Sequence, residues 1–331
     1  MVPWLRKIAL SACVVVILLA IAGASYQAIE TRLDARRFPE NGRLVDVGGY
    51  RLLLNCTGRG SPAVILESGF GDVSIEWRTV QPQIAKFSRV CSYDRAGYGG
   101  SDPGPMPRTS LQIAGELHAL LRNAGETPPY VLVGSSFGGY NVRAFNGLYP
   151  DEVIGIVLAD ATQEDQYELL PKAWSAISAA QLKHCERLAR YAFFVADLGI
   201  GRLMLRAQGA SGNDDYLILQ AKYLRARASE LEQMRVSAEQ ARVADQISDK
   251  PLVVLTAAEN TDSMLSSGLS AHDFEEFQRI WVDDLQMRLA RLSDRGRRIM
   301  VQGSSHDIPS DRPESIVNAV HELCTAATSA H

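Results

Sequence analysis

The chain has 331 residues, which is long enough to bury a large core as one α/β domain or as two smaller ones. Its formal net charge of −4 gives no electrostatic reason to expect a nucleic-acid partner. Hydrophobic residues make up 46 % of the chain, a share typical of folded globular proteins, which argues against disorder over most of the length.

Residues 1–29 are predicted to be a signal-anchor or a cleaved signal peptide. Two basic residues, Arg6 and Lys7, precede an uncharged apolar run, Ile8–Ile29, and a possible cleavage site lies within this run at residues 22–24. The run exceeds a typical short signal-peptide core and reaches the roughly 17 to 25 residues that span a bilayer, so we favour the anchor. Both alternatives export the folded part, because the basic residues hold the N-terminus in the cytoplasm.

Polar and charged residues fill positions 30–42, which we expect to link this segment to a folded domain. Closely spaced strands follow, with one helical stretch before the last of them. The predicted strands are Arg43–Val47, Tyr50–Cys56, Ala63–Ser68 and Arg89–Asp94, and the helical stretch is Ser74–Phe87.

Helices and strands then alternate, which predicts parallel βαβ units in a sheet covered on both faces. The predicted helices are 109–123, 137–149, 274–292 and 313–326, and the predicted strands are 130–133, 153–159, 251–257 and 297–303. Residues 163–249, here called the insertion, contain no good strand and are rich in helix formers. The sequence therefore predicts a core of residues 43–162 and 250–331, interrupted by a helical cap.

The stretch Gly134-Ser135-Ser136-Phe137-Gly138 fits the pattern G-x-S-x-G between a predicted strand and a helix. That pattern is typical of a serine nucleophile, Ser136, held on a strained turn. A serine hydroxyl needs a base to remove its proton. His306 is the candidate, because it lies on a loop after the last predicted strand, at the sheet edge where such folds gather reactive groups.

Four motifs in chain order make the sequence resemble the α/β-hydrolase fold superfamily, in its serine hydrolase branch with a helical cap. They are "ESGFGD", "YDRAGYGGSD", "GSSFGG" and "GSSHDIPSDRPE". The resemblance implies a mostly parallel eight-stranded sheet covered by helices on both faces, with the cap inserted after strand six. It also implies that Ser136 is the nucleophile and His306 the base, and that the backbone N–H groups of Phe70 and Phe137 form the oxyanion hole.

The acid of the triad is less determined than the other two members. Asp160 directly follows the sixth strand and is favoured, whereas Glu259 and Asp262 flank Asn260 after the seventh strand, where many relatives carry the acid. The sequence also departs from the usual pattern at two turns, since Ser68 and Ser135 stand where many relatives have histidine. Neither of those histidines is the base, so activity is not excluded.

Five cysteines are present, and one of them, Cys13, lies in the apolar N-terminal run. No C-x-x-C pair occurs, which argues against a zinc or thioredoxin-like site. In the family that the chain resembles, the second and fourth strands are antiparallel neighbours, which implies a disulfide between Cys56 and Cys91 in an oxidising compartment. Two buried free thiols are the alternative.

These features together predict an exported hydrolase of a small carboxylic ester or related acyl compound. An aminopeptidase-like amidase and a non-catalytic binding protein on the same fold are the alternatives. No metal or organic cofactor is implied. The predicted cap is expected to set substrate choice, with Phe193 and Phe194 as lining residues, and the sequence names neither the substrate nor the oligomeric state.

Overall fold

The computed structural model describes residues 3–37, 41–207, 209, 220–244, 247, 249–258 and 269–328. Contacts divide the chain into two compact units. The N-terminal unit holds residues 1–41 and 183–228, and the core unit holds residues 42–182 and 229–331.

Eight described strands of the core unit form one sheet in the order β1-β2-β4-β3-β5-β6-β7-β8. Only β2 is antiparallel to its neighbours, β1 and β4; all other pairs are parallel. This topology confirms the predicted fold class. The strands are β1 (Arg43–Asp46), β2 (Arg51–Thr57), β3 (Ala63–Glu67), β4 (Arg89–Tyr93), β5 (Tyr130–Ser135), β6 (Val153–Ala159), β7 (Leu252–Ala257) and β8 (Gly296–Val301).

Alternate residues of each central strand enter two separate hydrophobic clusters, one on each face of the sheet. In β5, Leu132 faces one cluster and Val133 the other, and both are fully buried. A strand buried on both faces needs an apolar side chain at every position, which explains the unbroken apolar runs. One face is covered by α3 (Ser110–Ala124), α4 (Gly138–Leu148) and α13 (Gln286–Ala290), and the other by η1 (Ser74–Arg78), α2 (Gln81–Ile84) and α15 (Pro313–Thr328).

Two predicted helices are divided in the structure. The stretch 74–87 consists of η1, a 3-10 helix, and α2, with Pro82 in the first turn of α2, where its missing N–H costs nothing. The stretch 274–292 consists of α12 (Ala271–Arg279), the π-helix η4 (Ile280–Leu285) and α13. Two short elements, η2 (Pro150–Glu152) and α14 (Ile308–Asp311), complete the core unit outside the insertion.

The described residues between β6 and β7 form helices joined by short loops and contain no strand. Their elements are α5 (Gln166–Leu169), α6 (Lys172–Arg190), the π-helix η3 (Phe193–Asp197), α7 (Ile200–Ala207), α9 (Ala221–Glu232) and α10 (Met234–Val243). The insertion does not form one unit, because residues 163–182 and 229–249 belong to the core unit. One reason is that α10 caps α3: Ser237 Oγ and Gln240 Oε1 accept hydrogen bonds from the first two N–H groups of that helix, at 3.0 and 2.9 Å.

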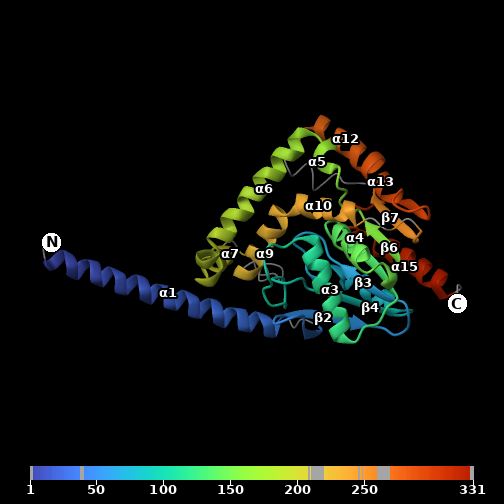
Figure 1. The fold of residues 1–331 in the computed structure, drawn as a ribbon. Coiled ribbons are helices and arrows are strands. Elements are labelled where there is room, and N and C mark those ends of the chain that lie inside the picture. The colour runs from blue at the N-terminus through green and yellow to red at the C-terminus, as the bar shows by residue number, and fades with distance from the viewer. Residues whose placement is uncertain are drawn as a thin grey trace. The chain divides into compact units, whose positions relative to one another are not determined.

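The N-terminal unit contains α1 (Pro3–Arg37), a single unbroken helix (Figure 1). Of the described residues, Trp4–Asp34 is the one stretch long and apolar enough to cross a membrane, although a signal sequence meets the same criterion. The helix continues through most of the predicted linker 30–42. The reason is that the charged residues there pair with α7, since Asp34 binds Arg202 at 2.5 Å and Glu30 binds Arg206 at 2.6 Å.

Candidate active site

Ser136 lies between β5 and α4 in a backbone conformation that L-residues rarely adopt, with φ of 49°. The turn is tight on both sides. A Cβ atom at Gly134 would lie 2.7 Å from the carbonyl oxygen of Gly138, and a Cβ atom at Gly138 would lie 2.5 Å from that of Glu67. The two glycines of the G-x-S-x-G pattern are therefore needed to let the strand, the turn and the helix approach each other.

His306 bridges the serine and a carboxylate. Its Nε2 atom lies 2.9 Å from Ser136 Oγ, and its Nδ1 atom lies 2.7 Å from Asp160 Oδ2. Asp160 directly follows β6, and its own backbone is strained, with φ of 42°. The carboxyl ends of parallel strands meet at one edge of the sheet, which is why residues far apart in sequence meet here.

Asp160 is fully buried and receives hydrogen bonds from more than the histidine. The backbone N–H of Ala257 donates to Oδ1 at 3.1 Å, and the indole N–H of Trp281 lies 3.1 and 3.2 Å from the two carboxylate oxygens. These donors fix the carboxylate and offset the cost of burying its charge.

Sequence reasoning missed Trp281. It lies in η4, and π-helical turns occur frequently at functional sites because they shift side chains relative to an α-helix. An apolar tryptophan inside a helical pattern is otherwise a packing residue, so the pattern alone could not have revealed this contact.

The environment of His306 stabilises its protonated form. Burial lowers the pKa of the imidazole, but the hydrogen bond to Asp160 and the charges of Asp160 and Asp72 outweigh it, and the pKa is raised above the ordinary 6.5. A raised pKa makes the imidazole a stronger acceptor for the proton of a serine hydroxyl.

The loop after β3 is held from two sides. Arg95 donates to the carbonyl oxygens of Ser68 and Gly69, both at 2.8 Å, and Glu76 accepts the N–H of Gly69 at 3.0 Å. Ser68 Oγ accepts the indole N–H of Trp77 at 2.9 Å. These bonds hold the turn that carries Ser68 and Gly69.

Arg95 is itself fully surrounded by opposite charge and aromatic rings. Its guanidinium binds Glu67 at 3.1 Å and Glu230 at 2.9 Å, and all three side chains are buried. The ring of Tyr98 lies 4.8 Å from the guanidinium carbon, and that of Phe137 lies 5.6 Å away. Arg95 therefore ties the loop after β3 to Glu230, which belongs to the insertion.

Two carboxyl groups, one on the loop after β3 and one in η1, lie close to Gly69 and the serine. A Cβ atom at Gly69 would lie 2.9 Å from Asp72 Oδ2, 3.5 Å from Ser136 Cβ and 3.8 Å from Glu76 Oε1. Burial and the charge of Asp72 raise the pKa of Glu76 to about 8, so this group holds its proton at neutral pH. Any side chain at position 69 would fill the space beside the serine.

The two residues predicted to supply the oxyanion hole lie at adjacent turns. Phe137 is buried at the N-cap of α4, where the first N–H groups of a helix have no acceptor within the helix. Phe70 is half-buried and packs against the cluster that contains Phe137. The alternative acids, Glu259 and Asp262, and the neighbouring Asn260 lie outside the described residues.

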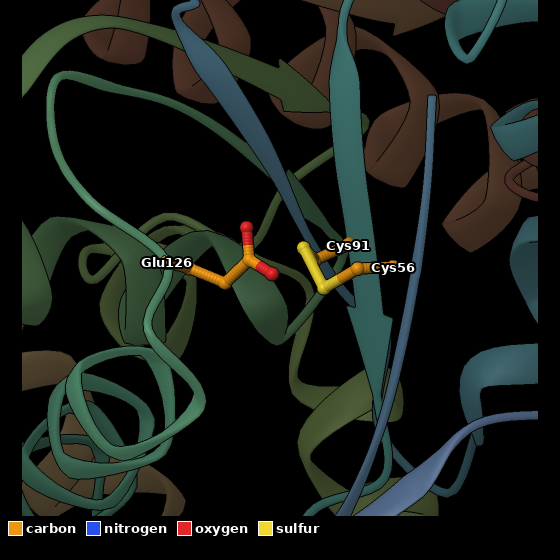
Figure 2. A group of neighbouring side chains, drawn as sticks. All are labelled: Cys56, Cys91 and Glu126. Atoms are coloured by element: carbon orange, nitrogen blue, oxygen red, sulfur yellow. A yellow bond between two sulfur atoms is a disulfide. The ribbon is translucent and has the colours of Figure 1, made fainter. Parts of the chain in front are cut away.

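In the described part of the chain, the potential metal ligands Cys56, Cys91 and Glu126 lie within 4.8 Å of one another (Figure 2). The two cysteines face each other across β2 and β4 and form a disulfide, which confirms the predicted bond. Disulfide sulfurs are not thiolate ligands, and the carboxylate of Glu126 is paired with Arg89 at 2.6 Å. In this state the group does not offer a metal site.

Comparisons with known proteins identify the family to which the chain belongs. A sequence profile described as "Alpha/beta hydrolase family" matches residues 64–319. A protein of Gibberella zeae named "AB hydrolase superfamily protein" is 26 % identical over 282 residues, which cover 79 % of this chain and 86 % of the relative. A "Probable transporter efuK" of Hormonema carpetanum is 32 % identical over 136 residues, but these cover 39 % of this chain and only 20 % of that relative.

A solved structure of a thermophilic esterase from Thermogutta terrifontis has the same fold. It is 22 % identical, with a TM-score of 0.61, and the match covers 86 % of this chain and 97 % of the esterase. The family profile extends from β3 to the last helix and so includes the elements that carry Ser136, Asp160 and His306. The chain belongs to the alpha/beta hydrolase family and is a hydrolase.

Proposed function

We propose that this hydrolase cleaves a carboxylic ester or a related acyl compound through a covalent acyl-enzyme on Ser136. The observation that carries the proposal is the continuous hydrogen-bonded chain from Ser136 Oγ through His306 to Asp160, with distances of 2.9 and 2.7 Å. A hydroxyl, an imidazole and a buried carboxylate in this order are the arrangement that activates a serine for acyl transfer.

In the proposed reaction, Ser136 Oγ attacks the carbonyl carbon while His306 Nε2 takes the hydroxyl proton. His306 then gives that proton to the leaving alcohol, and a water molecule repeats the sequence to release the acid. Asp160 keeps the proton of Nδ1 in place and stabilises the imidazolium that forms in both steps. The additional donors to Asp160 support this role, because they hold the carboxylate in one orientation.

The backbone N–H groups of Phe70 and Phe137 are proposed to stabilise the negative charge that develops on the carbonyl oxygen. Two observations support this assignment: Phe137 is at a helix N-cap, and the loop that carries Phe70 is held on both sides by Arg95 and Glu76. Donors fixed before the reaction stabilise the transition state without reorganisation.

The helices of the insertion are proposed to act as the cap that sets substrate choice. The buried contact of Glu230 with Arg95 supports this, because it connects residues 163–249 to the loop beside the serine. The chain before the core, residues 1–29 with the linker 30–42, is proposed to anchor the hydrolase to a membrane, with residues 43–162 and 250–331 exported. The disulfide supports an oxidising compartment.

A fluorophosphonate probe tests the reaction, since it labels an activated serine. We expect the wild type to be labelled, Ser136→Ala to lose labelling, and Ser135→Ala to keep it, because Ser135 interacts with Glu76 and not with His306. An unlabelled wild type at every pH that the fold tolerates would favour a binding protein.

Substrate class is tested by comparing p-nitrophenyl esters of increasing acyl length with aminoacyl anilides. We expect kcat/KM to be higher for the esters, and the reverse order would identify an amidase. Esterases and amidases share this fold and this type of nucleophile, so the comparison of substrates is what distinguishes the two activities.

A further inference from the structure

Helix α7 has its polarity reversed relative to a helix of a water-soluble protein. Its arginine Arg202 is 4 % exposed, whereas Ile200, Leu203 and Met204 are 44, 55 and 60 % exposed. These three apolar residues are spaced i, i+3 and i+4 and therefore lie on one face of the helix. In water, the apolar face of such a helix is normally the buried one.

Two arginines of α7, the buried Arg202 and the more exposed Arg206, bind the C-terminal part of α1. Arg202 Nε donates to Gln27 Oε1 at 3.0 Å and its Nη1 to Asp34. One turn further along, Arg206 pairs with Glu30 at 2.6 Å. The ion pairs orient α7 so that its apolar face points away from α1 and stays exposed.

The start of α7 is close to the apolar run of α1. A Cβ atom at Gly23 would lie 2.6 Å from the carbonyl oxygen of Leu198, and one at Gly199 would lie 3.1 Å from the ring of Tyr26. The segment that leads into α7 thus touches α1 at its apolar part, and α7 continues toward the charged residues Glu30 and Asp34.

The aromatic residues of α1 mark where a bilayer would end. Trp4 and Tyr26 are about 22 residues apart, which is roughly 33 Å along an α-helix at 1.5 Å per residue. The hydrocarbon core of a bilayer is about 30 Å thick, and tryptophan and tyrosine favour its two interfaces. Tyr26, and with it the start of α7, would then lie at the outer interface.

We propose that the exposed face of α7, formed by Ile200, Leu203 and Met204, rests in the outer interface of the same lipid bilayer that α1 crosses. Two more exposed aromatic residues in the same unit, Tyr191 and Phe194, precede α7 and suit such an interface. Phe194 was expected to line a pocket, and it is 53 % exposed here. The inference depends on the proposed anchor, not on the proposed reaction.

The occupant is a lipid surface because the face is continuous with a helix whose apolar residues are themselves exposed over its length. An interfacial helix normally carries its charges toward water and its apolar side into the lipid. In α7 the charges are instead neutralised by α1, which leaves the lipid-facing side purely apolar.

The test uses the full chain in phosphatidylcholine vesicles, with an environment-sensitive fluorophore on a single cysteine. The free cysteines Cys13, Cys185 and Cys324 are first replaced by alanine, and the disulfide is kept. Labels are placed by Leu203→Cys on α7, by Val16→Cys in the middle of α1, and by Glu186→Cys as the exposed polar control in the same unit. Circular dichroism and a cooperative thermal unfolding transition of each preparation report that the fold is intact.

We expect the label at position 203 to emit at shorter wavelength than the label at 186 and to be quenched several-fold more strongly by lipids with a shallow doxyl group. The label at 16 should be quenched most by a deep doxyl group. If 203 behaves like 186 while 16 is deeply quenched, the anchor stands and the inference about α7 is wrong. If 16 is not quenched either, both are wrong.

A blue-shifted emission at 203 without quenching by either lipid would assign the face to a protein partner and would also overturn the inference. The proposed reaction is tested separately in every case, because probe labelling of Ser136 does not require membrane contact.

Discussion

Arginines are buried against acidic side chains both beside the loop after β3 and between α1 and α7. The apolar side chains near the arginine are buried in the first region and exposed in the second. Around Arg95, the neighbouring rings of Tyr98 and Phe137 are fully buried, as in a protein core surrounded by water. Around Arg202, the neighbouring Leu203 and Met204 are more than half exposed. Buried arginines are explained by their partners in both regions, whereas the exposed apolar face of α7 has no such explanation within the protein and is the face that we propose to contact lipid.

The comparison teaches that a buried charged side chain gives little information about the medium around a helix. An exposed apolar side chain gives more. An ion pair can be satisfied inside either environment, since its partner supplies the compensation. Apolar surface has no such local partner, so whether it is buried or exposed depends on the surrounding medium.

The largest expected effect is on kcat, and it concerns the active site, the first of the two regions compared. Asp160→Asn removes the charge that stabilises the imidazolium of His306, so kcat should fall by about 10³ to 10⁴. Steady-state kinetics on the best p-nitrophenyl ester measure this. Near-full activity would transfer the acid's role to another residue, and Asp262→Asn would then be the decisive variant.

The next effect compares an arginine of each region. Arg95→Met leaves Glu67 and Glu230 buried without their cation, and it should lower the free energy of unfolding by about 3 to 5 kcal/mol. Arg206→Met removes a pair whose arginine is 44 % exposed and should cost no more than about 1 kcal/mol. Chemical denaturation in detergent measures both, and equal losses would contradict the difference.

A smaller effect is expected for Trp281→Phe, which keeps a ring in place but removes the indole N–H donor to Asp160. The lost hydrogen bond should lower kcat about 10-fold, equivalent to roughly 1.4 kcal/mol, with little change in KM. Loss of stability without loss of kcat would make Trp281 a packing residue only.

The smallest effect is on the pH profile. Burial lowers the pKa of His306 but its acidic neighbours raise it further, so kcat/KM should fall with decreasing pH at a midpoint above 6.5. Asp72→Asn removes one of these charges and should move the midpoint down. The stability that protonated His306 contributes is present at low pH and is lost as pH rises through the raised pKa. An unmoved midpoint would show that Asp72 does not act on His306.

Much of the fold and part of the site could be predicted from the sequence. Apolar runs and helical periods gave the order of elements, and the motifs around Ser136 and His306 identified residues that the structure brings together. Asp160 could be named because it ends a buried strand, and the carboxyl ends of parallel strands meet.

The remaining site residues could not be predicted, because their roles depend on contacts between distant segments. Glu76 and Trp281 lie inside helical patterns that suggest packing alone, and the partner of Arg95 in the insertion is Glu230, more than a hundred residues away. The helical conformation of residues 30–37 could not be predicted for the same reason: Glu30 and Asp34 look like part of a solvated tether until α7 supplies their arginines.

The bond between Cys56 and Cys91 joins β2, the only strand that runs against the rest of the sheet, to β4. A host that keeps thiols reduced would yield chains in which the β1–β2 hairpin is retained by hydrogen bonds and packing alone. Recombinant production should therefore follow a secretory route. The elements that carry Ser136, Asp160 and His306 lie beyond β3 in the sheet. In a reduced preparation, the β1–β2 hairpin should therefore detach from the sheet before the catalytic residues are displaced.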